Sequence, residues 1–562
     1  MLTNETEKTL SRFLAIGTFV VTTLVITGSV TDPVNVTKFV PLGAVAISAF
    51  LILGRDKFRV LVRSRKTTLL LALSFLLASI NAFIASSAPV SQSLYGAYGR
   101  NNGFLTYIFL LLILIGAASF SRLESFKKLS FALYASAIVN FIYCLWVLTF
   151  GDFLGWTNPY GNILGTFGNP NFSGAFIALS SVSLFTLVLD RSNSKGLRAS
   201  VVIAIAIGIY EVYMSNALQG QILLVAGFGY LGFLLLYYKN KVASFIYLVA
   251  GLSFAIIGIL GTQQIGPLAG YLYKTSVTLR GQYWLAAWNM GNSHPLTGVG
   301  FDSYGDWYRR SREAKALVSP GVNVTTNTAH NVPLDIFAFG GWPLLISYLA
   351  IFSLSVISII RIIRRGKSFN PVFASLSSAW LCYQLQSIIS INQLGLAIWG
   401  WLLGGALIAF DQIDKQNASQ DEAPDKNTKR RTRETGVVSA GLLGSAGILI
   451  GAFIAWPALN ADMKWSSAQN SRDLVKFEES LLPTYMNPQS SYKYGNSIQV
   501  LEQSGLREKA RQYALAAIQF NPESFEAWKV LYLISGSTDA EKAQALQNMK
   551  RLDPLNPDIV SQ

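Results

Sequence analysis

The feature that most limits how this chain can fold is a series of thirteen apolar segments separated by polar loops. An α-helix needs about 20 residues to cross the hydrocarbon core of a bilayer, and most of the segments approach or exceed this length, although several are shorter. In the whole chain 51% of residues are hydrophobic and only 13% are charged, a composition typical of integral membrane proteins. We therefore predict an all-α polytopic protein of about 13 transmembrane helices, near residues 13–30, 39–54, 67–86, 104–120, 129–149, 172–190, 199–214, 222–238, 244–261, 333–360, 371–390, 396–411 and 436–456.

Positive charge is distributed unevenly between the two sides of this predicted bundle. The loops on one side contain 24 Lys and Arg residues, whereas those on the other side contain eight, six of them in residues 262–332. Cytoplasmic loops of membrane proteins carry this excess, so we predict a cytoplasmic N-terminus and an extracytoplasmic C-terminal end. Because topology accounts for most of the formal net charge of +15, no nucleic acid partner is expected.

The longest loop, residues 262–332, is far longer than a connection between two helices requires, and long loops are usually functional. It contains both histidines, His294 and His330. His294 precedes a proline and is predicted to belong to a turn. His330 stands directly before an apolar segment, where an imidazole that titrates near neutral pH is a candidate for proton transfer. The alternative is a histidine that only caps or hydrogen-bonds the start of a helix.

Arginines outside the cytoplasmic loops are few, so each is informative. Arg100 precedes one apolar segment, and Arg280 opens a stretch whose spacing with Trp284 predicts an amphipathic helix at the membrane surface. Guanidinium groups bind phosphate through two parallel hydrogen bonds, which makes a lipid diphosphate a suitable partner. For the three arginines within residues 309–312, anchoring to lipid headgroups is favoured over a role in the site.

Two further polar features carry weaker signals. Asn169 and Asn171 lie in a Gly- and Pro-rich loop, where turn formation is the first interpretation and binding of sugar hydroxyls is the alternative. The two cysteines, Cys144 and Cys382, lie in apolar segments and predict neither a disulfide framework nor a metal site. No His and carboxylate residues have the spacing of metal ligands, so neither a metal nor another cofactor is expected.

The end of the chain divides into a linker, one more membrane segment and a soluble domain. After a membrane domain of residues 1–411, residues 412–435 are polar and predict a disordered cytoplasmic linker. The Gly- and Ala-rich segment 436–456 predicts an additional transmembrane helix that serves as a tether more than as part of the polar core; packing of its small residues against another helix is the alternative. In residues 457–562 an Asn-Pro pair recurs after 34 residues, which predicts a small extracytoplasmic tetratricopeptide-like domain; a generic helical hairpin is the alternative.

Four motifs, in this order, make the chain similar to a known family. They are GTFGNPNFSGAF at 165–176, Arg280 with Trp284, HPLTGVGFDSY at 294–304 and AHNVPLDIFAFGGWPLL at 329–345. Together they resemble the bacterial O-antigen ligase and polymerase superfamily, over roughly residues 60–410. The resemblance implies a glycosyltransferase of the GT-C type in the plasma membrane. Such an enzyme moves a glycan from an undecaprenyl diphosphate carrier to an acceptor hydroxyl without a nucleotide sugar or a metal.

The resemblance also implies roles for individual residues. His330 corresponds to the family's essential histidine and Arg280 to the arginine of its large loop, while Asn331 is expected to fix that loop. Many relatives have an arginine in a middle Ser-Arg-Gly sequence, where this chain has Gln219, and a neutral amide does not replace a fixed charge against a diphosphate. Either Arg100 compensates, or the donor binds in another geometry, or the chain is not a working ligase.

Three classes of function remain open from the sequence. The leading hypothesis is a metal-independent, inverting glycosyltransferase whose acceptor is a glycolipid, a glycan or, as in O-linked oligosaccharyltransferases, a protein. Its rival is a transporter of lipid-linked sugars or polysaccharide, which is expected to place charged residues near the bilayer midplane and to show an internal repeat. The third is an inactive scaffold that recruits a protein partner through the C-terminal domain. Membrane lipids are partners in each case.

Overall fold

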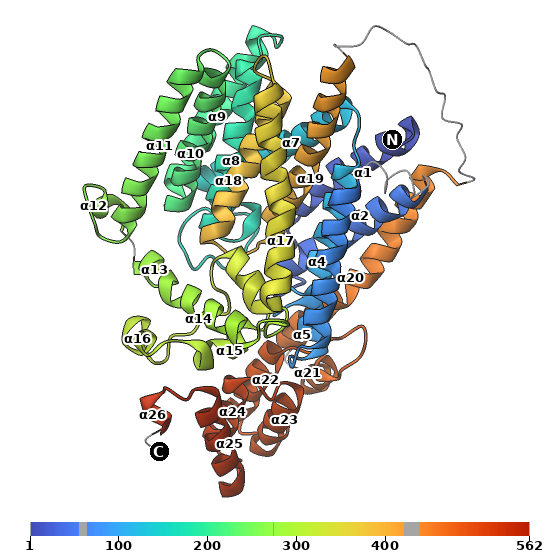
Figure 1. Ribbon diagram of the computed structural model, residues 1–562. Helices are drawn as coiled ribbons and strands as arrows, with labels where there is room; N and C mark the ends of the chain where they lie inside the picture. Colours follow the sequence, from blue (N-terminus) through green and yellow to red (C-terminus); the bar gives the residue numbers. More distant parts are fainter. Residues whose placement is uncertain (1, 56–64, 274, 421–437, 472, 561–562) are drawn as a thin grey trace.

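The protein is described here by a computed structural model that covers residues 2–55, 65–273, 275–420, 438–471 and 473–560. All named elements in these ranges are helices, which confirms the all-α prediction (Figure 1). The predicted linker lies mostly outside the described ranges, which resume shortly before the last long apolar helix.

A helix occupies the position of each of the thirteen predicted spans, and ten of these helices are long and apolar enough to cross a membrane. Those ten are α2 (Asn35–Arg55), α4 (Lys66–Ile84), α7 (Leu123–Phe150), α8 (Pro170–Leu189), α9 (Lys195–Met214), α10 (Leu218–Tyr237), α11 (Lys241–Thr262), α17 (Val332–Arg365), α19 (Leu394–Gln420) and α20 (Ala440–Ser471). The other three are α1 (Asn4–Thr23), the shorter apolar helix α6 (Phe104–Ala118) and α18 (Pro371–Ile389).

Helix α1 departs from the prediction because it begins at Asn4 instead of residue 13 and ends at Thr23. Its charged first turns belong to the bundle because the side chain of Glu7 is buried and fully hydrogen-bonded. The Glu7 carboxylate accepts bonds from the Ser121 backbone N–H and hydroxyl at 2.9 and 2.6 Å and from the Ser125 hydroxyl at 2.8 Å. Buried carboxylates are tolerated when satisfied in this way, which hydropathy alone does not reveal.

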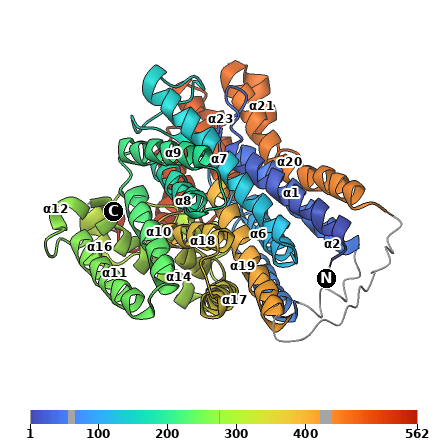
Figure 2. The ribbon, with the colours of Figure 1, turned by 90° about the horizontal axis from the view of Figure 1, so that it is seen from above.

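Helix α20 packs closely along α2, as the view from above shows (Figure 2). Gly447 and Gly451 allow this approach: a Cβ at Gly447 would lie 2.4 Å from the Ser48 Cα, and one at Gly451 would lie 2.1 Å from the Gly43 carbonyl oxygen. The Ser48 hydroxyl also donates to the Gly444 carbonyl at 2.8 Å. Small residues that bring two helix backbones together are a common basis of membrane packing, so α20 is a packed helix and not a loose tether.

Two helices run past the predicted domain boundaries. Helix α19 continues from the membrane domain to Gln420, so the predicted linker begins as helix. Helix α20 continues to Ser471, past the predicted end of the last span at residue 456. The buried Trp465 of this extension belongs to the core of the C-terminal domain. A single helix therefore joins the last membrane segment to the soluble domain, because the apolar face that begins in the membrane continues into a second core.

The long loop is largely helical, with α12 (Ala269–Leu272), α13 (Thr275–Thr278), α14 (Arg280–Ser293), α15 (Tyr304–Ser311), α16 (Ala314–Ala316) and η2 (Leu317–Gly321). It is fixed to a break in α17, where Gly341 has a φ of 64°. There the N–H of Trp342 donates to the Pro295 carbonyl at 2.8 Å, and the N–H of Val299 donates to the Ala338 carbonyl at 2.8 Å. A side chain at position 341 would collide with the Pro295 carbonyl, so these two motifs of the sequence pair through their backbones.

The C-terminal domain consists of α21 (Leu474–Leu481), α22 (Ser491–Gln503), α23 (Arg507–Phe520), α24 (Phe525–Leu533), α25 (Asp539–Leu552) and α26 (Pro557–Val560). Helices α22 and α23 pack together, as do α24 and α25, around a separate apolar core. This arrangement agrees with a repeat of helix pairs, and the tetratricopeptide assignment stays a prediction. The domain lies at the same end of the molecule as the long loop, opposite the N-terminus (Figure 1).

Buried ion pairs join this domain to the long loop. Arg312 binds Asp553 at 2.8 Å, and both side chains are fully buried. Arg309 binds Asp553 at 3.1 Å and Glu526 at 2.9 Å, and Arg310 pairs with Glu523. The interpretation of these arginines as headgroup anchors is therefore wrong, because their guanidinium groups are turned into an interface between domains and away from lipid.

The central ion of this cluster gives a testable prediction. Replacing Asp553 by Ala leaves the buried guanidinium groups of Arg309 and Arg312 without their shared carboxylate, a change that typically costs about 3–5 kcal/mol. We expect hydrogen exchange in α15 and α25 to accelerate and the C-terminal domain to become sensitive to protease. The control is Glu508→Gln, which alters an exposed ion pair and should leave both unchanged. Unchanged exchange in Asp553→Ala would show that the ion pairs do not hold the domain.

Candidate functional site

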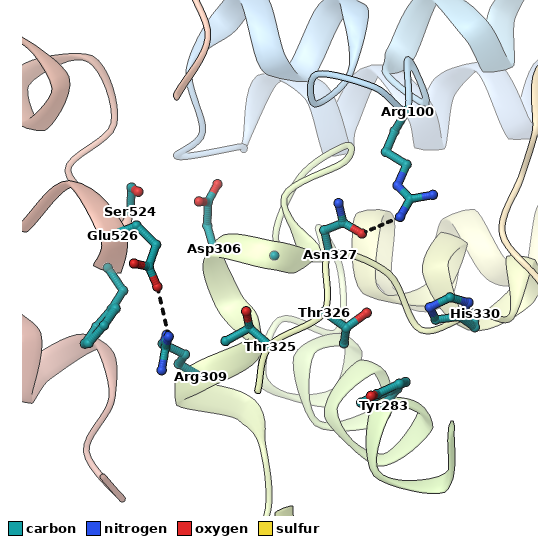
Figure 3. Close-up of a pocket in the computed structure, with 12 residues that line it drawn as sticks. Arg100, Tyr283, Asp306, Arg309, Thr325, Thr326, Asn327, His330, Ser524 and Glu526 are labelled. Atoms are coloured by element: carbon teal, nitrogen blue, oxygen red, sulfur yellow. Dashed lines mark hydrogen bonds and ion pairs between the residues drawn. The ribbon is translucent and has the colours of Figure 1, made fainter. Parts of the chain in front are cut away.

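A cavity of about 440 Å³ opens between the membrane domain, the long loop and the C-terminal domain (Figure 3). Its volume falls within the range of about 300–1,000 Å³ that is usual for small-molecule sites. Arg100 and His330 line one end, together with Tyr283 (Figure 3). Arg309 and residues 524–526 of the C-terminal domain line the other end. Arg100 and His330, which were expected from the sequence to act together, therefore both line this cavity.

His330 is held at the cavity by its backbone. It has a φ of 54°, a conformation that usually costs roughly 1–3 kcal/mol in a residue with a side chain. Asp335 secures the preceding turn by accepting bonds from the Thr328 hydroxyl at 2.6 Å and the Ala329 N–H at 2.7 Å. Asn331 then caps α17, because its side chain accepts from the Leu334 N–H at 3.0 Å. The strained backbone is therefore imposed by its surroundings, and Asn331, which does not line the cavity, stays a predicted site residue.

The His330 imidazole packs near the ring of Tyr283, with a distance of 6.0 Å between the ring centroids. Its ring nitrogens make no hydrogen bond to any described residue, so they are available to a ligand in the cavity. Burial, followed by the charges of Arg280 and Arg100, lowers the pKa of His330 to about 4. The imidazole is consequently neutral at neutral pH, the protonation state that a general base requires.

Arg100 stands in a short loop that a buried carboxylate organises. Asp302 accepts bonds from the N–H groups of Ala97 at 2.7 Å and Asn102 at 3.2 Å, and burial raises its pKa to about 6. The Arg100 guanidinium donates to the Asn327 side chain at 2.9 Å (Figure 3). It forms no ion pair within the described ranges, so its charge is not neutralised by direct contact.

Arg280 does not itself line the cavity, but it is the first residue of α14 and lies one helical turn before Tyr283, which does. Across the described part of the chain its guanidinium group has neither a hydrogen bond nor an ion pair. Burial lowers the pKa of Arg280, and its charge acts on His330 more strongly than that of Arg100 does. Two half-buried cations that form no ion pair with any described residue thus lie near one neutral imidazole, and such a site favours an anion.

Four other predicted site residues do not line the cavity. Asn169 caps α8, since its side chain accepts from the Asn171 N–H at 2.9 Å, and Asn171 itself is exposed. Trp284 packs against the helical core, and Gln219 is buried at the start of α10. The turn interpretation of the two asparagines agrees with these contacts. Asn169 also donates to the Tyr160 hydroxyl at 3.0 Å, and Tyr160 is near enough to act electrostatically on Arg100.

Sequence reasoning missed the carboxylates that position the site, Asp302 and Asp335, and the wall supplied by residues 524–526. Asp302 is the acidic residue of the motif at 294–304, and Asp335 is that of the motif at 329–345. Their place in these motifs is the sequence signal that could have identified them. His294, which was not assigned to the site, does not line the cavity. Its ring packs on Trp307 with the centroids 4.8 Å apart, and its Nδ1 lies 3.0 Å from the Ser293 hydroxyl.

Residues 203–349 match the family model of O-Antigen ligase. The match runs from α9 to the middle of α17 and contains both Arg280 and His330, whereas Arg100 lies outside it. It supports the O-antigen ligase superfamily, a glycosyltransferase-like enzyme and a surface polysaccharide ligase-like function. No curated protein matched the chain. Among the described residues, no three His, Cys, Asp or Glu side chains are grouped so that they could hold a metal ion, and metal independence stays a prediction.

The lowered pKa of His330 predicts the acid limit of activity. Because the imidazole stays neutral down to a pKa of about 4, kcat/KM should fall only near that pH, well below the ordinary histidine value of about 6.5. A bound diphosphate offsets the two arginines and favours the imidazolium, so the acid limb of kcat should lie at higher pH than that of kcat/KM. Both profiles follow from initial rates between pH 3 and 8.

The matched variant is His330→Gln, which keeps a hydrogen-bonding side chain but not a base. Turnover should drop about 10²–10⁴-fold and the acid limb should disappear. If His330→Gln turns over at the wild-type rate with the same acid limb, the histidine is structural.

Proposed function

We propose that this protein transfers or polymerises a glycan from an undecaprenyl-diphosphate carrier onto an acceptor hydroxyl at the outer face of the plasma membrane. The observation that carries the proposal is that Arg280 and Arg100, beside the neutral imidazole of His330, form no ion pair with any described residue. The O-antigen ligase match over the segment that holds two of these three residues supports it. The acceptor is a lipid-linked or free glycan, and an O-linked protein acceptor is the alternative.

In the proposed reaction the two arginines bind the diphosphate and stabilise the negative charge that grows as the bond from the sugar C1 to the phosphate oxygen breaks. The acceptor oxygen forms the new glycosidic bond from the opposite face, so the anomeric centre inverts. His330 takes the proton from that hydroxyl, and the proton then passes to solvent or to the released diphosphate. Arg100 supplies the second cation in place of the arginine that Gln219 does not provide.

The orientation of the chain belongs to this proposal. An N-terminus in the cytoplasm, as the distribution of Lys and Arg predicts, places the long loop and the C-terminal domain outside it, because these lie at the opposite end of the molecule (Figure 1). Residues of both line the cavity. Lipid-linked donors that have been carried to the outer leaflet would then reach the cavity without crossing the membrane again.

The positions of two ionisable side chains buried in membrane helices favour an enzyme over a transporter. Lys38 is the fourth residue of α2, and Glu211 is the fourth residue from the end of α9. Both are buried, and each lies about one turn from a helix end, away from the midplane where the charges of a transport pathway are expected. Lys38 donates to the Thr22 carbonyl at 2.7 Å, a bond that fixes the end of α1.

A substitution that changes the shape of the cation at position 280 but keeps its charge tests the proposal. Arg280→Lys keeps the positive charge but loses the planar fork that holds two phosphate oxygens, so transfer from a purified lipid-linked donor should be severely impaired. The assay follows loss of the donor and gain of glycan on the acceptor, with and without EDTA. Lys315→Ala, which removes an exposed charge from the same loop, should transfer normally. Full activity of Arg280→Lys, or loss of wild-type activity in EDTA, would contradict the mechanism.

A further inference from the structure

The end of the cavity away from His330 has a chemistry of its own. Its cation, Arg309, is neutralised by Glu526 and Asp553 and covers the ring of Phe525 at 4.1 Å. The remaining lining there is rich in hydroxyl and carboxyl groups from Thr325, Asp306 and Ser524 (Figure 3). Whereas the His330 end carries uncompensated positive charge, this end offers mainly hydrogen-bond acceptors.

Asp306 is the distinctive group at this end. Its Oδ2 accepts hydrogen bonds from the side-chain amides of Gln92 at 2.9 Å and Asn521 at 3.2 Å. Its Oδ1 has no hydrogen bond, and the carboxylate has no ion pair, to any residue in the described ranges. A carboxylate oxygen that is held in place and open to a cavity is a strong acceptor for a ligand hydroxyl.

The two amides that orient Asp306 come from different parts of the chain. Gln92 belongs to α5 (Val90–Tyr95) of the membrane domain, whereas Asn521 follows α23 of the C-terminal domain. Asn521 is itself fully buried, and its side chain also accepts from the Glu523 N–H at 3.2 Å. The geometry around Asp306 is therefore complete only when the C-terminal domain is docked on the loop.

We propose that this end of the cavity binds the acceptor as an uncharged carbohydrate, with Asp306 accepting a sugar hydroxyl and the C-terminal domain forming the wall of the subsite. This inference rests on the proposed glycosyl transfer, for which it names the acceptor class. Neutral sugars are rich in hydroxyl donors, which satisfy a carboxylate. Anionic acceptors are disfavoured, since Asp306 and Glu526 would repel a carboxylate or phosphate. The donor diphosphate and the acceptor thus enter opposite ends, between which Thr325 and Thr326 lie (Figure 3).

A binding assay separates this inference from the transfer reaction. The full-length protein in detergent is applied to an array of neutral oligosaccharides, printed beside the same oligosaccharides with one primary alcohol oxidised to a carboxylate. We expect binding to neutral members and weaker binding to their oxidised forms. Asp306→Asn should bind the neutral members about 10- to 100-fold more weakly, the range for losing a hydrogen bond to a charged group, and should discriminate less against the oxidised forms.

Asn521 serves as the positioning variant. Asn521→Ala should raise the acceptor KM in the transfer assay and leave the donor KM unchanged, whereas partial unfolding would lower apparent kcat and leave both KM values unchanged. Its control is Gln547→Ala, because Gln547 carries an exposed amide on α25 of the same domain. That variant should behave as wild type.

The possible results distinguish the proposed acceptor site from the proposed glycosyl transfer. Asp306-dependent binding of neutral oligosaccharides by a protein that transfers no glycan would contradict the proposed function and sustain the acceptor site. Transfer activity with binding that is unaffected by Asp306→Asn, or stronger binding of the oxidised oligosaccharides, would overturn the acceptor site and sustain the proposed function.

Discussion

Two buried carboxylates, Asp302 and Asp335, set the geometry on which the cationic end of the cavity depends. Each accepts hydrogen bonds from backbone N–H groups, one in the loop of Arg100 and the other in the turn before His330. Both lie near enough to Arg100 to act on its charge, yet neither forms an ion pair with it. Their negative charge is directed at backbone donors, so the arginines remain free for a ligand. A direct ion pair at either position would have closed the site to an anion.

The arginines of residues 309–312, unlike Arg100, form ion pairs with carboxylates. There each guanidinium group is matched by acidic side chains of the C-terminal domain, and the interface is closed. The contrast between paired and unpaired arginines within one loop distinguishes a docking contact from a binding site. It also gives the cavity two unlike ends, one with arginines that form no ion pair with described residues and the other with hydroxyl and carboxyl groups.

Much of the membrane fold could be predicted from the sequence, because hydropathy and the distribution of basic residues are local signals. The predicted spans all coincide with helices, and the packing of α20 through its small residues was the alternative that composition left beside a tether. The start of α1 could not be predicted, since the carboxylate of Glu7 is satisfied by residues more than 100 positions away. The partners of Arg309 and Arg312 lie more than 200 positions away, so sequence alone left lipid headgroups as the simplest explanation.

The candidate site shows the same difference between local and long-range signals. His330, Arg280 and Arg100 could be proposed from the sequence because charged residues are rare in the predicted outer loops. Asp306 and Asn521 could not, because they meet only when the C-terminal domain docks. The most direct measurement is an experimental structure of the full-length protein with a non-hydrolysable lipid-linked glycan diphosphate. The account predicts that the diphosphate contacts Arg280 and Arg100 beside the His330 imidazole, with the lipid extending towards the membrane helices. A diphosphate bound outside this cavity, or at its Arg309 end, would contradict it.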